Sequence, residues 1–176
     1  GKSMLFTASM HGNPEIYQMN LETRQLQRMT NDSAIDTEAR YAPDGKSFIF
    51  TSDRGGSAQI YRYDLANSSY NRLTFRGAFN ARGTLSADGK KLALVHRPSD
   101  SNYKVAIQDL NSSVTNILTP TSLDESPSFS PNGQMVVYAT REGSRGLLSI
   151  MSLDGRFRMN LPSEQGEVRE PAWAPK

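Results

Sequence analysis

Four short segments carry the side chains best suited to bind a partner. They include carboxylates, hydroxyls and arginines, and the residue types differ from one segment to the next, which favours a docking surface held by a rigid scaffold. Turn chemistry is the alternative, because Asp, Asn and Ser are favoured where a chain turns. The candidate partner-binding residues are Asp36, Thr37, Glu38, Arg82, Asp124, Glu125, Ser126, Arg169 and Glu170.

The carboxylates among these residues could also act as ligands of a cation. Calcium takes oxygen ligands, and the candidates for a calcium site are Glu38, Glu125 and Glu170. The sequence contains no compact loop with the spacing of calcium ligands, so we favour solvated carboxylates balanced by nearby arginines. We therefore expect no metal and no cofactor, with calcium in the channel kept as the weaker alternative.

The groups needed for covalent catalysis are missing or scattered. The chain has no cysteine and no Gly-x-Ser-x-Gly segment, and His11 and His96 occupy unrelated positions. Each histidine is expected at the surface or half-buried, not as a metal ligand. The segment Asp53-Arg54-Gly55-Gly56 lacks the Lys-Ser/Thr of a phosphate loop. A binding module is thus favoured over an enzyme or gating domain acting on an oligosaccharide or a peptide.

A 44-residue repeat spans the whole chain and must position these segments. Its clearest marker is an Asp-Gly-Lys turn or a close variant, whose glycines are Gly1, Gly45, Gly89 and Gly133. The repeats are therefore 1–44, 45–88, 89–132 and 133–176, which together form one domain. The third repeat is shifted by one residue in its middle, and it returns to the 44-residue spacing before it ends.

Each repeat contains four short apolar or aromatic runs separated by turn residues. Asp-Gly and Asn-Gly between such runs indicate hairpins, because glycine adopts positive φ without steric cost. Four strands in about 44 residues is typical of a β-propeller blade. We therefore predict an all-β fold, a propeller of four four-stranded blades, either a closed small ring or part of a six-bladed propeller.

The candidate residues precede the innermost strands and would surround the channel mouth. Tyr41, Phe129 and Trp173 recur at one repeat position and are expected to pack in the core. Trp173 would instead be exposed if the last strand is unpaired.

The repeats resemble those of the TolB-type β-propeller family, also described as PD40 or WD40-like repeats. The resemblance is carried by Tyr41-Ala-Pro-Asp-Gly-Lys46, by Leu123-Asp-Glu-Ser-Pro-Ser128 and most specifically by Pro171-Ala-Trp-Ala-Pro175. It implies a six-bladed propeller behind an N-terminal α/β domain, which this sequence does not contain. The best match to the family's contact loops is Thr37-Glu38.

The resemblance also implies a function. It implies a periplasmic protein of the Tol–Pal envelope system that supports outer-membrane integrity and cell division. The expected partner is the lipoprotein Pal, with other Tol proteins and colicins as further candidates.

Composition limits the partners. Lys and Arg number 20 and Asp and Glu number 18, and these charges are interspersed along 176 residues. The sequence contains no basic stripe that would indicate binding to nucleic acid, and no apolar run reaches the ~18 residues of a membrane span.

Both ends of the sequence fall in the repeat's hairpin turn. The first repeat thus lacks its innermost strand, and the last strand, near Trp173, lacks a following partner. Three outcomes are open: the last strand pairs beside residues 4–7 and closes the ring, the blades form an open arc, or chains associate through unpaired edges.

Overall fold

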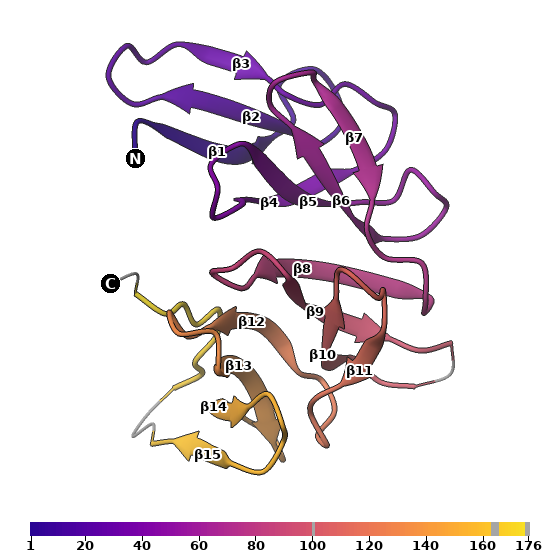
Figure 1. Cartoon of the computed structure of the whole chain (residues 1–176), viewed down its shortest axis with the longest axis vertical. Coiled ribbons are helices and arrows are strands. Elements are labelled where there is room, and N and C mark those ends of the chain that lie inside the picture. The colour runs from indigo at the N-terminus through magenta and orange to yellow at the C-terminus, as the bar shows by residue number, and fades with distance from the viewer. Residues whose placement is uncertain (100, 163–165, 175–176) are drawn as a thin grey trace.

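The computed structural model describes residues 1–99, 101–162 and 166–174. Among these residues it contains fifteen β-strands and no helix, and the strands form separate antiparallel sheets that follow one another along the chain (Figure 1). No helix long and apolar enough to cross a membrane occurs in the part of the chain that the structure describes. The predicted all-β propeller fold is confirmed.

The sheets are consecutive meanders, in which each strand pairs with the next. The first sheet has three strands and the other three sheets have four. Their bounds are β1 Ser3–Ala8, β2 Glu15–Asn20, β3 Leu26–Arg28, β4 Asp36–Tyr41, β5 Ser47–Ser52, β6 Gln59–Asp64, β7 Ser69–Arg72, β8 Phe79–Leu85, β9 Lys91–Arg97, β10 Lys104–Asp109, β11 Thr115–Ile117, β12 Glu125–Phe129, β13 Met135–Glu142, β14 Arg145–Ser152 and β15 Arg158–Leu161.

In the second to fourth sheets the Asp-Gly or Asn-Gly turns join the innermost strand to the next strand outward. Gly45 has φ 65°, and its N–H donates to the carbonyl of Ala42 at 2.9 Å. The Asp44 carboxylate accepts the N–H of Lys46 at 2.9 Å, which closes the turn. The equivalent glycines of the next two repeats have φ 68° and 66°. The regular Asp-Gly position is therefore explained by the hairpin alone.

The hydrophobic core lies between successive sheets. On β5, Phe48 and Phe50 face the first sheet and pack with Ile16, whereas Ile49 faces the third sheet and packs with Leu92. Alternation along a strand sends neighbouring side chains to opposite faces, so one strand contributes to two clusters. A third cluster between the third and fourth sheets includes Tyr138, which is fully buried. Each inner sheet is thus covered on both faces, as blades of a propeller are.

In the first three blades a buried threonine ties the end of the blade to the start of its third strand. The Thr30 hydroxyl accepts the N–H of Ile16 at 3.0 Å, and Thr74 and Thr119 make the same bond at the same repeat position. The recurring Leu-Thr and Met-Thr endings of the sequence thus satisfy a buried backbone donor that would otherwise be unpaired.

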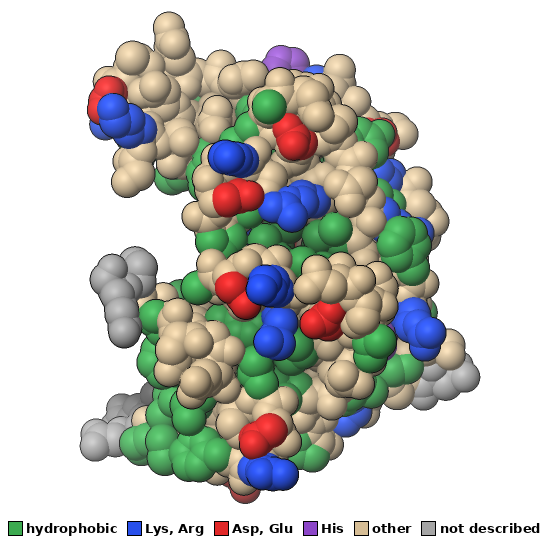
Figure 2. All heavy atoms as spheres, in the orientation of Figure 1, with side chains coloured by type: hydrophobic (Ala, Val, Ile, Leu, Met, Phe, Trp, Pro, Cys, Tyr) green, Lys and Arg blue, Asp and Glu red, His purple; other side chains and the backbone are tan. Residues whose placement is uncertain are grey.

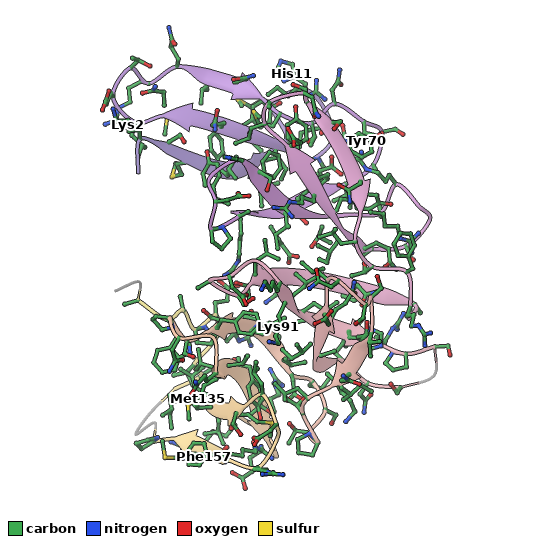
Figure 3. All side chains as sticks on the ribbon, in the orientation of Figure 1. Lys2, His11, Tyr70, Lys91, Met135 and Phe157 are labelled. Atoms are coloured by element: carbon green, nitrogen blue, oxygen red, sulfur yellow. The ribbon has the colours of Figure 1, made fainter. Side chains whose placement is uncertain are left out.

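Within the described residues the four sheets form an open arc. β1 lies at the edge of its sheet, and Trp173 instead donates its N–H to the Ser128 hydroxyl at 3.2 Å, beside β12. Figure 3 shows His11, in the first sheet's hairpin, and Phe157, before β15, at opposite ends of the molecule. Figure 2 shows a hollow on the side between the two ends. The last segment therefore does not pair beside residues 4–7, and the single chain forms the open arc and not the closed ring.

The three aromatic residues at the shared repeat position differ in how deeply they are buried. Phe129 is buried in the core and Tyr41 is half-buried against the first sheet. Trp173 is 36% exposed, so of the two possibilities that the sequence leaves for this side chain, exposure is the one observed. The physical reason is that residues 171–174 form no strand pairing and cover only the side of β12.

Candidate functional site

Four residues spaced 44 apart have left-handed backbone, three of them in the inner strands β4, β8 and β12 and one, Glu170, in the segment after β15. Their φ values are 59° for Glu38, 53° for Arg82, 53° for Ser126 and 51° for Glu170. In the second to fourth sheets the register between the inner strand and its neighbour shifts at the same place, which is a β-bulge. Bulges redirect side chains, and a left-handed conformation is unfavourable for residues other than glycine. The fold therefore turns four polar side chains toward one mouth.

Arg82 is the centre of the resulting charge network. Its Nε lies 3.3 Å from Glu38 Oε1, and its Nη1 lies 3.2 Å from Glu125 Oε2 and 3.9 Å from Glu170 Oε1. Nη1 also donates to the hydroxyl of Ser126 at 2.6 Å. The side chains of Arg82, Glu38 and Glu125 are each about one-third exposed, which limits the strength of every single pair.

Glu38 is held from two sides. Its Oε2 accepts the Thr51 hydroxyl at 2.7 Å and the backbone N–H of Arg82 at 2.8 Å. Thr51 lies on β5, next to β4 in the same sheet, while Arg82 belongs to β8 in the following sheet. Glu38 thus joins the inner strands of two blades through hydrogen bonds to a charged acceptor, which are stronger than neutral ones.

A cleft of about 500 Å³ opens beside this network. Its charged wall includes Glu38, Arg82, Glu125, Arg141 and Arg169. Its apolar wall is formed by Phe79, Ala81, Val95, Tyr103 and Leu123. The Phe79 and Tyr103 rings meet edge to face with centroids 5.2 Å apart. An apolar wall beside a few oriented polar groups is the usual composition of a binding cleft.

Two of the predicted contact residues lie away from the surface. Asp36 is fully buried, and its carboxylate accepts from the Arg54 guanidinium at 2.6 Å. Burial raises the pKa of the Asp36 carboxyl above its usual range, and hydrogen bonds from Ser52 and Arg54 offset part of that rise. Asp124 is also fully buried and accepts the hydroxyls of Thr121 and Thr140 at 2.8 and 2.6 Å. As placed, neither carboxylate is exposed to a partner.

The remaining predicted residues surround the mouth to different degrees. Thr37 is half-buried on β4, and Ser126 is 3% exposed but reached by Arg82. Glu170 is 76% exposed, the most open of the carboxylates at the mouth. Arg169 pairs with Glu167, and this hydrogen bond lowers the pKa of the Glu167 carboxyl. The structure therefore brings together most of the predicted set.

No three acidic or histidine side chains form a metal-binding group in the residues that the structure describes. The carboxylates named as calcium candidates contact the Arg82 guanidinium instead. His96 is buried between the second and third sheets, where its Nδ1 lies 2.8 Å from Asn80 Oδ1. Burial lowers the pKa of His96, which keeps the ring neutral. His96 is therefore more buried than the sequence suggested.

The sequence did not identify the apolar wall or the support of Glu38. Phe79 and Leu123 occupy the same repeat position, three residues before the left-handed one, and that spacing was a usable signal. Tyr103 and Thr51 come from other strands, so only the fold brings them to the mouth.

The comparisons with known proteins agree with the propeller fold. The TolB beta propeller domain family matches residues 1–176. The chain belongs to that family. It is 86% identical over 85 residues to the Tol-Pal system protein TolB of Acinetobacter baylyi, a match covering 48% of this chain and 20% of that protein.

A crystal structure of TolB from Acinetobacter baumannii shares 86% identity and superposes with a TM-score of 0.95. The match covers 100% of this chain and 44% of that one. This TolB-family chain thus spans less than half the length of both relatives. A Mycobacterium tuberculosis puromycin-hydrolyzing peptidase is 16% identical with a TM-score of 0.70, over 94% of this chain and 28% of that one. That likeness shows the fold alone.

Proposed function

We propose that the chain is the protein-binding propeller of a Tol–Pal envelope component, and that it docks a Pal-like lipoprotein at the channel mouth. The family match over residues 1–176 and the names of the relatives from Acinetobacter support the Tol–Pal assignment. We propose binding and not catalysis because the charged side chains of the cleft pair with one another across blades.

The observation that carries the proposal is the left-handed backbone at one repeat position. Glu38, Arg82, Ser126 and Glu170 all adopt positive φ where glycine would be less strained. Strain of this kind is retained where the surrounding structure fixes it, and it concentrates at binding and active sites. Four strained polar residues facing one mouth support a docking surface at this place.

The wider role follows from the same family. We propose that the protein acts in the periplasm, supports outer-membrane integrity and cell division, and contacts other Tol proteins. Colicin segments are proposed as competing ligands of the same mouth. Self-association through the open edge at β1 is a further proposal, and a solution molecular mass tests it.

Binding to the soluble domain of a Pal lipoprotein, measured by isothermal titration calorimetry, tests the site. The double variant Thr37→Arg plus Glu38→Arg places two cations beside Arg82 at the mouth. Electrostatic and steric conflict in the centre of an interface typically weakens binding at least tenfold. The expected result is therefore a loss of Pal binding by a chain that is still folded.

The chain offers a matched control. Glu22 and Thr23 are the same two residue types, exposed in the turn between β2 and β3 at the outer edge of the first sheet. Glu22→Arg plus Thr23→Arg changes the net charge equally and is expected to leave Pal affinity unchanged. Unaltered binding by the mouth variant, or equal loss in both variants, contradicts the site. Absence of binding by the parent chain contradicts the proposed partner.

A further inference from the structure

We propose that the Arg82 guanidinium is a built-in cation of the channel mouth, which occupies the place a divalent cation would take among three carboxylates. The chain then holds its inner strands together without calcium. The proposal goes beyond partner docking and does not depend on it, because it concerns the free chain.

The cation and its carboxylates come from four separate parts of the fold. Arg82 lies on β8, Glu38 on β4 and Glu125 on β12, while Glu170 follows β15 in the last described segment. The three carboxylates approach the guanidinium within 3.3, 3.2 and 3.9 Å. One cation thus links three blades and the segment beyond them, as a bound metal ion does when its ligands come from separate loops.

Arg82 is fixed at both ends of the residue. Its backbone N–H donates to Glu38 Oε2 at 2.8 Å, and its Nη1 donates to the buried hydroxyl of Ser126 at 2.6 Å. The bulge at φ 53° directs the side chain into the mouth. These contacts place the charge in one position, so it screens the carboxylates continuously.

The distances are compatible with a metal ion in place of the guanidinium. Glu125 and Glu170 oxygens both face the same nitrogen, at 3.2 and 3.9 Å. Calcium binds oxygen at about 2.3–2.6 Å, so the Glu125 oxygen would move by roughly 0.6–0.9 Å and the Glu170 oxygen by roughly 1.3–1.6 Å. Both side chains are at least one-third exposed and have the freedom to do so. Arg82 blocks this arrangement by its volume and by its charge.

Removing the guanidinium is therefore expected to create calcium binding. Arg82→Met keeps most of the side-chain volume and leaves three carboxylates without their cation. The melting temperature of this variant should rise by roughly 3–6 °C in ~10 mM CaCl2, given a site of about millimolar affinity. NaCl at equal ionic strength is the control for screening. Calorimetric titration with CaCl2 measures the affinity directly.

Two variants and the parent chain complete the experiment. Arg82→Lys keeps the charge, and Arg141→Met removes a different cation of the cleft, one that lies 3.7 Å from Glu167. In calcium the melting temperatures of both variants, and of the parent chain, are expected to change by less than about 1 °C beyond the change in NaCl. Arg82→Gln replaces Arg82→Met if the latter does not fold. Calcium binding by the parent chain at similar affinity, or none by a folded Arg82→Met or Arg82→Gln chain, overturns the proposal.

Discussion

Left-handed backbone in residues other than glycine recurs at two repeat positions, and the two differ in what their side chains do. One position is the bulge at the channel mouth, and the other is the hairpin between the third and fourth strands of a blade. The mouth residues are Glu38, Arg82, Ser126 and Glu170, and the hairpin residues are Arg24, Ser68 and Ser113. Position 113 stands one residue later than the 44-residue spacing gives, because the third repeat is shifted there.

At the outer hairpins the interactions are local. The Asn20 side chain accepts the N–H groups of Glu22 and Thr23, and the Arg24 N–H donates to the Asn20 carbonyl at 2.9 Å. Asp64 and Asp109 accept the equivalent backbone donors in the next two repeats. The turn is therefore complete within about five residues, and the side chain at the left-handed position takes no part in it.

At the mouth the left-handed residues connect blades. Glu38 binds the backbone of Arg82, and Arg82 binds Ser126, each 44 residues away. In this chain a positive φ thus belongs to a local turn at the outer hairpins, and to a network of long-range contacts between blades at the mouth. Substitutions at both positions test this distinction.

The largest effect is expected at Glu38. Glu38→Ala removes the acceptor of the Thr51 hydroxyl and of the Arg82 N–H, together with one ion pair. Leaving hydrogen-bond donors unpaired costs about 1–3 kcal/mol, so we expect a loss of about 2 kcal/mol in the free energy of unfolding. Urea denaturation measures it. Glu22→Ala at the outer hairpin should change the free energy of unfolding by less than about 0.5 kcal/mol. Comparable losses in the two variants would show that the mouth and the outer hairpin do not differ in this way.

Glycine substitutions should have opposite signs at the two positions. Arg24→Gly relieves left-handed strain at an exposed hairpin and is expected to stabilise the chain by about 0.5 kcal/mol. Arg82→Gly relieves the same strain but loses the contacts to Glu38, Glu125 and Ser126, so a net loss of about 1–2 kcal/mol is expected. Urea denaturation of both variants gives the signs directly. Stabilisation by Arg82→Gly would show that the network contributes little.

The sequence was sufficient for the blades and for the approximate place of the mouth. Spacing alone located the Gly45 turn, the threonine endings and the segments that contain Glu38 and Arg82. These features are local, and a repeat displays them several times. The sequence could not separate Asp36 from Glu38, because two residues along a bulged strand decide which carboxylate is buried.

Contacts between distant parts of the chain could not be predicted from the sequence either. The contact of Trp173 with Ser128, and not with the strand near residue 4, depends on the angle between successive sheets. Small differences in that angle accumulate over the arc, and no single residue determines them. The ties from Arg82 to Glu125 and Glu170 likewise depend on how neighbouring inner strands are placed.

The smallest effect concerns the pH dependence of an outer hairpin. Hydrogen bonds from the Ser112 backbone and hydroxyl lower the pKa of the Asp109 carboxyl. A carboxyl whose pKa is lower in the folded state stabilises the fold above its unfolded pKa, and this contribution disappears as the pH falls through the folded one. Asp109→Asn keeps the acceptor oxygen without the charge, as Asn20 does in the first repeat.

Urea midpoints of Asp109→Asn measured between about pH 5 and pH 2 should therefore fall less steeply than those of the parent chain, since unfolded Asp titrates near ~3.9. The reciprocal variant Asn20→Asp is the control. It places a carboxylate where the N–H groups of Glu22 and Thr23 converge, and should steepen the acid limb. Because these turns are closed within a few residues, neither change should alter the proposed binding of Pal at neutral pH. Parallel pH profiles for all three chains would show that the hairpin carboxylates gain nothing from their backbone donors.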